Sequence, residues 1–160
     1  MQRSVFSVAG RNCTLLGQPD AGPLLIQPVN GQEEELLDQE AELLAGQVSC
    51  PFGLAAFPVG DWNGALSPWP APPVWKDQSF GGRAGETLEF LTGQLLPALS
   101  PLPGQVILGG YSLAGLFALW AASRTGCFAG VAACSPSVWF PGWGDYLDTH
   151  PLQTKLVYLS

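Results

Sequence analysis

The sequence predicts a single α/β domain built on a mostly parallel sheet, and two observations support this. Apolar residues make up 47% of the 160-residue chain and charged residues only 12%, a composition that requires a large buried core and argues against disorder. Short apolar runs alternate with stretches at helical spacing, which favours parallel strands joined by right-handed crossovers. Parallel strands are covered on both faces, so we expect helices on both sides of the sheet.

The first part of the chain is expected to form a hairpin, a buried strand and a helix. Residues 4–8 alternate in polarity and predict an edge strand that pairs with residues 13–16. The apolar run 24–26 predicts a buried strand. Asn30 is a favourable N-cap, three acidic residues follow it, and Gly46 ends the helical pattern. The acidic residues indicate a solvated helix face.

The rest of the chain continues the alternation after a long loop rich in proline, glycine and tryptophan. This loop spans about 60–85, and its aromatic residues favour a packed segment over a disordered one. The predicted elements are a strand at 52–59, a helix at 87–99, a strand at 105–109, a helix at 113–125, a strand at 130–134, a helix at 144–148 and a strand at 155–160.

Charge and cysteine usage exclude several classes of function. The formal net charge is −7 and Lys and Arg form no cluster, so we expect no nucleic-acid partner. None of the four cysteines lies in a CxxC pair, so neither a zinc site nor a redox motif is expected. The N-terminus lacks the pattern of a signal peptide, which predicts a cytoplasmic protein. Residues 106–123 are long and apolar enough for a membrane span, but Gly109, Gly110 and Ser112 interrupt the run and argue against one.

The segment from Gly109 to Gly115, Gly-Gly-Tyr-Ser-Leu-Ala-Gly, carries the chemistry. It lies between a predicted buried strand and a predicted helix, the context that a nucleophile elbow requires. The strand-to-helix turn is so tight that residues two before and two after the serine must be small, and Gly110 and Ala114 satisfy this. Although a serine in an ordinary tight turn is the alternative, the strand before and the helix after favour Ser112 as a nucleophile.

An acyl-transfer site also needs amide hydrogens that bind the developing oxyanion. The backbone N–H of Leu113 would face the same space as the Ser112 hydroxyl. The second donor is expected after an earlier strand, and we assign it to the backbone of Trp62 first and Asp61 second.

Three segments resemble the esterase D branch of the α/β-hydrolases, a group that includes siderophore esterases. They are Asp61–Asn63 with Leu66–Pro70, then Gly110–Leu119, then Ser135–Gly142. The resemblance implies an ester or thioester substrate, an acyl-enzyme on Ser112 and no cofactor or metal. It further implies that residues 135–139 border the site, so Tyr111, Ser135 and Trp139 are expected to line the pocket.

A general base and its orienting carboxylate are not evident. In α/β-hydrolases they follow the serine in loops after later strands, and we expect those strands to be missing, so that residues 1–160 form one incomplete domain. His150, the sole histidine, should lie at the amino end of the last strand, ~17 Å from the serine. Three readings stay open: a truncated esterase, a non-catalytic binding module, and a fragment completed by another chain. A truncated sheet would leave an edge open to self-association.

Overall fold

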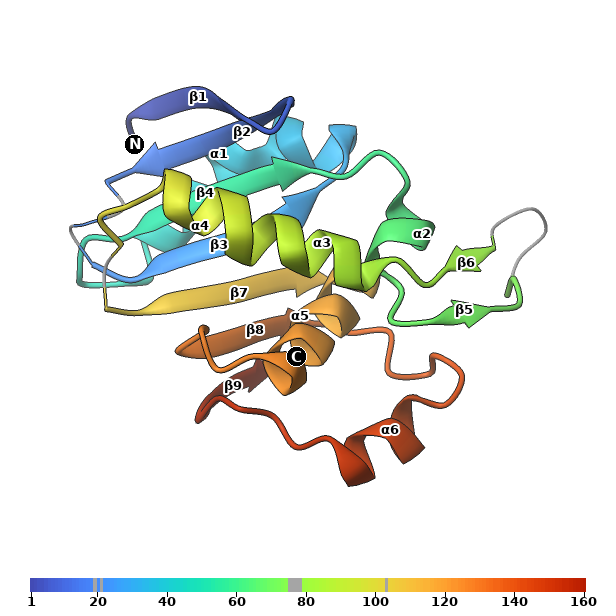
Figure 1. Ribbon diagram of the computed structural model, residues 1–160. Coiled ribbons are helices and arrows are strands. Elements are labelled where there is room, and N and C mark those ends of the chain that lie inside the picture. Colours follow the sequence, from blue (N-terminus) through green and yellow to red (C-terminus); the bar gives the residue numbers. More distant parts are fainter. Residues whose placement is uncertain (19, 21, 75–78, 103) are drawn as a thin grey trace.

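The computed structural model describes residues 1–18, 20, 22–74, 79–102 and 104–160 (Figure 1). Within these residues the chain forms a seven-stranded sheet of order β1-β2-β4-β3-β7-β8-β9. Its strands are β1 Arg3–Val8, β2 Arg11–Gly17, β3 Leu24–Val29, β4 Gly53–Pro58, β7 Val106–Tyr111, β8 Gly130–Cys134 and β9 Leu156–Leu159. β2 pairs antiparallel with β1 and β4, and the remaining pairings are parallel. The predicted mostly parallel sheet is confirmed.

The amino-terminal elements follow their sequence signals. β1 and β2 form the predicted edge hairpin. Helix α1 spans Gly31–Ala45 and begins with a complete capping box, in which the Asn30 side chain accepts from the amides of Gln32 and Glu33 while the Glu33 carboxylate accepts from the Asn30 amide. This arrangement satisfies three backbone donors at the helix start, so the helix begins at a defined residue beside the end of β3.

The long loop after β4 contains short elements packed against the core. They are α2 Trp62–Leu66, β5 Pro70–Ala71 and β6 Phe80–Gly81, with β5 and β6 paired antiparallel. The side chains of Trp62 and Trp69 are partly buried against the core, as the aromatic content predicts, whereas Trp75 lies outside the described residues. The loop is therefore a packed layer over the sheet's carboxyl edge.

The single helix predicted for 87–99 is one continuous helical segment with a widened turn in its middle. It consists of α3 Ala84–Phe90, the π-helical turn η1 Leu91–Leu95 and α4 Leu96–Ala98. The Leu96 amide bonds to the Leu91 carbonyl, five residues back. Pro97 has no amide hydrogen to bond four residues back, which accounts for a local change of helical pitch.

Helices cover the two faces of the sheet unequally (Figure 1). Helix α1 packs on one face through a small core of Leu16, Val29, Leu37, Ala41, Leu54 and Ala56. The other face carries the main core, which includes residues of α3, η1, α4, α5 (Leu113–Arg124) and α6 (Trp143–Thr149). Beyond β3, no helix of the described residues covers the α1 side of the sheet. A hollow of about 290 Å³ lies there over β7, β8 and β9.

None of the helices in the described ranges combines the length and the apolar character that crossing a bilayer requires. The apolar run 106–123 instead divides between β7 and α5.

Candidate active site

Ser112 lies in the sharp turn between β7 and α5. Its backbone dihedrals are φ 55° and ψ −116°, a conformation that costs a non-glycine residue of order 1–3 kcal/mol and is retained only where the surroundings enforce it. The amide of Ser112 donates to the Cys134 carbonyl (2.9 Å), and its carbonyl accepts from the Leu116 amide (3.1 Å). Strand and helix ladders therefore hold both ends of this residue, as a nucleophile elbow requires.

The small residues around Ser112 are sterically required. A Cβ on Gly110 would lie 2.5–2.6 Å from the backbone and Cβ of Ala114, and a Cβ on Gly115 would lie 3.1 Å from Pro136 Cβ. The first distance is a clash and the second is tighter than ordinary contact. The sequence argument for a crowded strand-to-helix turn thus matches the packing.

A second serine lies against Ser112. The Ser137 hydroxyl oxygen is 3.2 Å from the Ser112 hydroxyl oxygen, and the Ser137 amide donates to the Ser112 carbonyl at 3.0 Å. Ser137 is 2% exposed. Sequence reasoning placed the segment 135–139 beside the site but did not single out this residue. The signal was its position in a serine-rich turn after the strand adjacent to the elbow.

The residues expected to line a pocket are exposed, and they lie directly before the serine or in the loop after β8. Tyr111 directly precedes Ser112 and is 61% exposed, while Trp139 is 51% exposed. Ser135 is exposed and adopts a positive φ of 42°. Trp139 meets the Phe80 ring edge-on at 6.3 Å, so the loop after β8 packs on the segment between β4 and α3. Their role as pocket lining stays a prediction.

The sheet order bears on the second oxyanion donor. β3 lies between β4 and β7, so Asp61 and Trp62, which follow β4, are separated from Ser112 by one strand. The β3–β7 pairing ends at Ile26 and Leu108, and Asn30 and Ser112 each follow the end of that pairing by four residues along their own segments. Gly31 is the first residue of α1, as Leu113 is of α5. Amides at this position have no partner within their helix.

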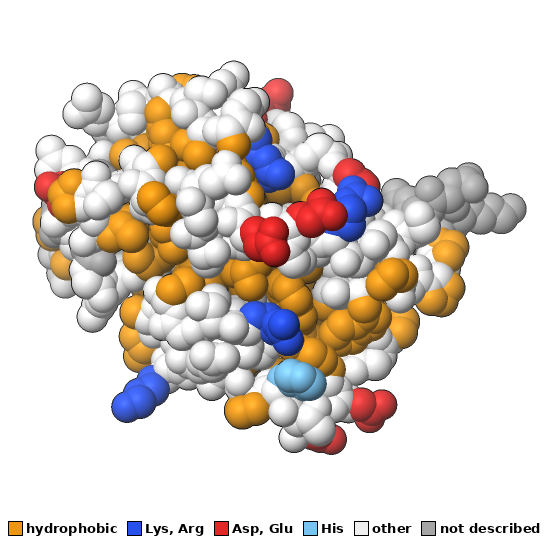
Figure 2. All heavy atoms as spheres, in the orientation of Figure 1, with side chains coloured by type: hydrophobic (Ala, Val, Ile, Leu, Met, Phe, Trp, Pro, Cys, Tyr) orange, Lys and Arg blue, Asp and Glu red, His pale blue; other side chains and the backbone are white. Residues whose placement is uncertain are grey.

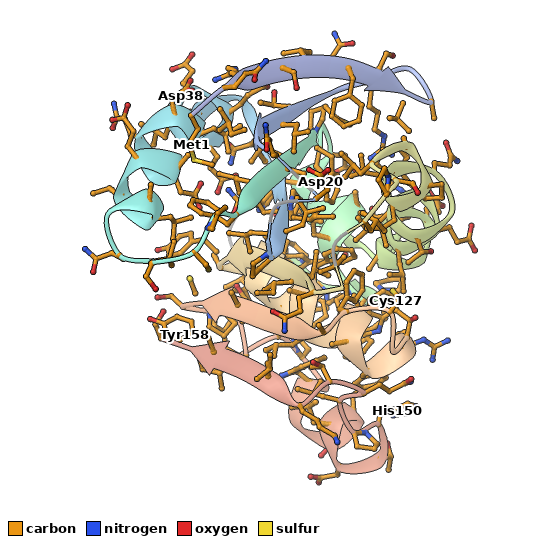
Figure 3. All side chains as sticks on the ribbon, turned by 90° about the vertical axis from the view of Figure 1, so that its left-hand side faces the viewer. Met1, Asp20, Asp38, Cys127, His150 and Tyr158 are labelled. Carbon is orange, nitrogen blue, oxygen red and sulfur yellow. The ribbon has the colours of Figure 1, made fainter. Side chains whose placement is uncertain are left out.

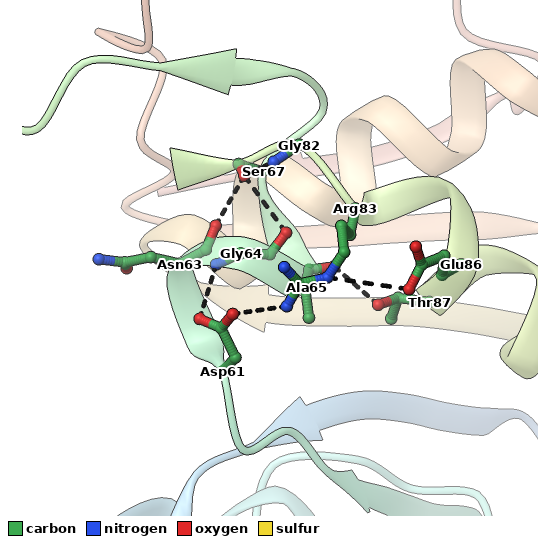
Figure 4. Close-up of polar contacts among 9 residues, drawn as sticks. All are labelled: Asp61, Asn63, Gly64, Ala65, Ser67, Gly82, Arg83, Glu86 and Thr87. Carbon is green, nitrogen blue, oxygen red and sulfur yellow. Dashed lines mark hydrogen bonds and ion pairs between the residues drawn. The ribbon is translucent and has the colours of Figure 1, made fainter. Parts of the chain in front are cut away.

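Asp61 instead takes part in a network that joins α2 to α3 (Figure 4). Its carboxylate accepts from the Gly64 amide and from the Arg83 guanidinium. The hydrogen bond from Arg83, followed by that from Gly64, lowers the pKa of Asp61. Buried Ser67 accepts from the Gly82 amide and donates to the Asn63 carbonyl, and Thr87 donates to the Ala65 carbonyl. These contacts fix the loop backbone.

His150 caps α6 at a distance from the elbow. Its ring stacks on Tyr146 with centroids 4.1 Å apart, and Nδ1 lies 3.0 Å from the Tyr146 carbonyl. Within the described chain its contacts are confined to α6. Figure 3, seen from the amino ends of the parallel strands, shows His150 and Tyr158 on opposite sides of β9. His150 is the C-cap residue of α6, in the connection that leads to the start of β9. Asp145 and Asp148 are exposed residues of the same helix.

A polar hollow of about 620 Å³ lies elsewhere on the carboxyl edge, beyond β4. The residues that line it include Arg11, Glu34, Asp61, Arg83 and Glu86, but Ser112 does not border it. We base the candidate active site on the strained serine rather than on the size of this hollow, because chemistry depends on the geometry of reacting groups.

Comparison with solved structures identifies the fold. An IroE-like serine hydrolase from Shewanella oneidensis matches 99% of this chain with a TM-score of 0.84 at 18% identity. The siderophore hydrolases EstA and EstB from Aspergillus nidulans match 98% and 99% of the chain, with TM-scores of 0.68 and 0.69 at 18% and 20% identity.

The chain spans 60% of the length of the Shewanella protein and 68% of each Aspergillus protein. No protein-family model and no curated protein sequence matches it. Three findings agree: the order of the strands, the strained serine between a strand and a helix, and the similarity to these solved structures. The chain has the α/β-hydrolase fold.

Proposed function

We propose that this chain carries the nucleophile of a serine hydrolase that cleaves carboxylic esters or thioesters through an acyl-enzyme on Ser112. The observation that carries the proposal is the Ser112 backbone, at φ 55° and ψ −116°. Strain of this kind persists where function requires it, and here it lifts a hydroxyl above the junction of β7 and α5.

The proposed reaction follows from the groups around Ser112. Its Oγ attacks the substrate carbonyl carbon and gives up its proton to a base. The carbonyl oxygen becomes an oxyanion that the Leu113 amide binds, and the alkoxide or thiolate leaves as the acyl-enzyme forms. Water then hydrolyses that ester. The described contacts of Ser112 include no general base. We therefore expect full activity only where a base and its orienting carboxylate, from beyond these contacts, reach the Ser112 hydroxyl.

The substrate class is drawn from the solved neighbours. Two of them are siderophore hydrolases, so ester-linked siderophores belong in a first substrate panel beside simple aryl esters. No cofactor is required by this reaction.

A binding module is the second candidate function, and one observation favours it. His150 is engaged within α6, while exposed aromatic rings stand at Tyr111, next to the serine in the chain, and at Trp139, two residues after Ser137. If these rings bind a ligand while no base reaches Ser112, the chain would hold an acyl or siderophore-like ligand without turnover.

Covalent labelling with a fluorophosphonate separates the two functions. We expect the wild-type chain to be labelled and to release p-nitrophenol from a short ester slowly, and we expect Ser112→Ala to do neither. Ser123→Ala is the matched control, because it removes the hydroxyl of a serine that has hydrogen-bond partners of its own but lies near the other end of α5, away from the elbow. Equal labelling of Ser112→Ala would rule out this nucleophile, whereas saturable ligand binding without labelling would support the binding module.

The same assay identifies the second oxyanion donor. Gly31 and Trp62 are each the first residue of a helix, where proline is tolerated and removes little besides the amide hydrogen. We propose Gly31 over the predicted Trp62 and Asp61, because the Asn30 side chain engages the next two amides and leaves this one to a ligand. Gly31→Pro should slow labelling by about 100-fold, with Trp62→Pro near wild type. The reverse result would restore Trp62.

A further inference from the structure

Ser137 has no assigned role in the proposed reaction, yet it makes two contacts with the nucleophile residue. Its amide donates to the Ser112 carbonyl at 3.0 Å, and its hydroxyl lies 3.2 Å from the Ser112 hydroxyl. The amide of Ser112 in turn donates to the Cys134 carbonyl. Together these bonds continue the β7–β8 pairing beyond the ends of the two strands, so the loop after β8 lies against the turn at Ser112.

The position of Ser137 is fixed by its surroundings. Ser135 bends the chain with a φ of 42°, which costs of order 1 kcal/mol or more for a residue with a Cβ. Pro136 packs on the first turn of α5, where Gly115 leaves no spare room. The Phe140 amide donates to the Ser137 carbonyl at 3.0 Å. Ser137 as a residue is 2% exposed and its backbone is hydrogen-bonded on both sides, so its hydroxyl loses little conformational entropy when it forms a hydrogen bond.

We propose that Ser137 is a positioning residue that holds the Ser112 hydroxyl in its attacking rotamer and donates a hydrogen bond to the oxygen as it loses its proton. A serine hydroxyl is both donor and acceptor, so the pair can reverse direction without moving heavy atoms. At rest either hydroxyl can donate to the other. When the Ser112 O–H turns to the base and its proton passes to that base, the Ser137 O–H donates to the Ser112 oxygen that becomes negative.

This hydrogen bond favours the charged form of Ser112 and therefore lowers the pH at which the nucleophile becomes reactive. Hydrogen bonds to charged groups are the strong class. Removing this one corresponds to about a 10- to 100-fold loss of rate. The inference rests on the proposed function, because it assigns Ser137 a part in the chemistry of Ser112.

The test measures the second-order rate of fluorophosphonate labelling from pH 6 to pH 10. Ser137→Ala should slow labelling by about 10- to 100-fold and move the rising limb of the pH profile to higher pH. Ser137→Thr keeps a hydroxyl and should restore most of the rate and the position of the limb. Ser123→Ala should change neither. A Ser137→Ala profile that coincides with wild type overturns the inference, as does a lowered rate with an unmoved limb, which indicates a merely structural role.

A second measurement is independent of reactivity. Chemical denaturation of Ser112→Ala, Ser137→Ala and the double variant forms a double-mutant cycle. If the two hydroxyls bond, the double variant loses less stability than the sum of the single variants. An additive cycle overturns the inference whatever the labelling shows. If the cycle shows coupling between the two hydroxyls but the wild-type chain resists labelling, the proposed hydrolase function is refuted. A role for Ser137 in attack is then refuted with it.

Discussion

The elbow and the β9 edge are neighbours in one sheet but differ in how completely they are enclosed. From Leu113 to Ser123 every residue of α5 is buried, whereas all four side chains of β9 are 41–59% exposed. Figure 2 shows hydrophobic side chains at the surface around α5 and α6, with few charges among them. Apolar hollows lie against both faces of β9, about 290 Å³ on the α1 side and about 410 Å³ on the side of α5 and α6.

The difference shows what each region needs from the rest of the molecule. A strained serine keeps its conformation because ladders, a crowded turn and a buried helix leave it no alternative. β9 has a paired backbone along one side and little cover for its side chains, so its apolar surface is available to a partner. The contacts that hold the turn at Ser112 all come from this chain, whereas the exposed side chains of β9 can still pack against a partner.

The largest effect should come from breaking the elbow at Gly110. Valine is well suited to strands, so a loss of stability in Gly110→Val cannot come from strand propensity. It arises from the steric clash with Ala114. We expect a loss of about 3 kcal/mol in the free energy of unfolding, together with loss of labelling. Gly144→Ala in α6, where an added Cβ meets open space, is the control and should gain up to about 1 kcal/mol. Denaturant titration measures both, and a Gly110→Val variant as stable as wild type contradicts the crowded turn.

A smaller effect should come from relieving the strain at Ser112. Glycine adopts a positive φ without penalty, while alanine keeps the Cβ that serine has. Both variants lose the hydroxyl and its contact with Ser137, so their difference isolates backbone strain. Ser112→Gly should be about 1 kcal/mol more stable than Ser112→Ala in urea titrations. Equal midpoints would show that the turn is relaxed.

The smallest change in stability should come from charging the exposed edge. We propose that β9 mediates self-association, and Tyr158→Glu should convert a concentration-dependent sedimentation coefficient to that of a monomer. Because Tyr158 is 58% exposed, the free energy of unfolding should change by less than about 0.5 kcal/mol. Val5→Glu, at a 61% exposed position of β1 on the opposite edge, should leave association unchanged. A wild-type chain that is monomeric at every concentration contradicts the proposal.

Local signals in the sequence were sufficient for most of the elements. The capped start of α1, the hairpin, and the strand and helix that flank Ser112 each depend on neighbouring residues, and each is confirmed. Only part of the leucine content of α1 is buried: Leu37 is buried, but Leu36 and Leu43 are 53% and 72% exposed. Helix α1 packs on the sheet through Leu37 and Ala41, against residues of β2, β3 and β4.

The order of strands in the sheet could not be read from local pattern. The second oxyanion donor is predicted in the loop after residues 52–59, and β3 lies between that strand and β7, so this assignment stays a prediction that the Gly31→Pro and Trp62→Pro variants test. The contact between Ser112 and Ser137 likewise depends on pairing between β7 and β8, together with a bend at Ser135 that no residue preference announces. Tertiary pairing decided both.

Ser160 is hydrogen-bonded to the loop after β8, the loop that contacts Ser112. The Ser135 amide donates to the Ser160 carbonyl at 2.8 Å, and Ser135 stands two residues before Ser137. A molecule that binds along β9 and shifts its end would therefore be felt at the reactive hydroxyl. If Ser112 is acylated as proposed and binding at β9 is coupled to it through this bond, thermodynamic reciprocity requires that acylation change the affinity of that molecule by the same factor.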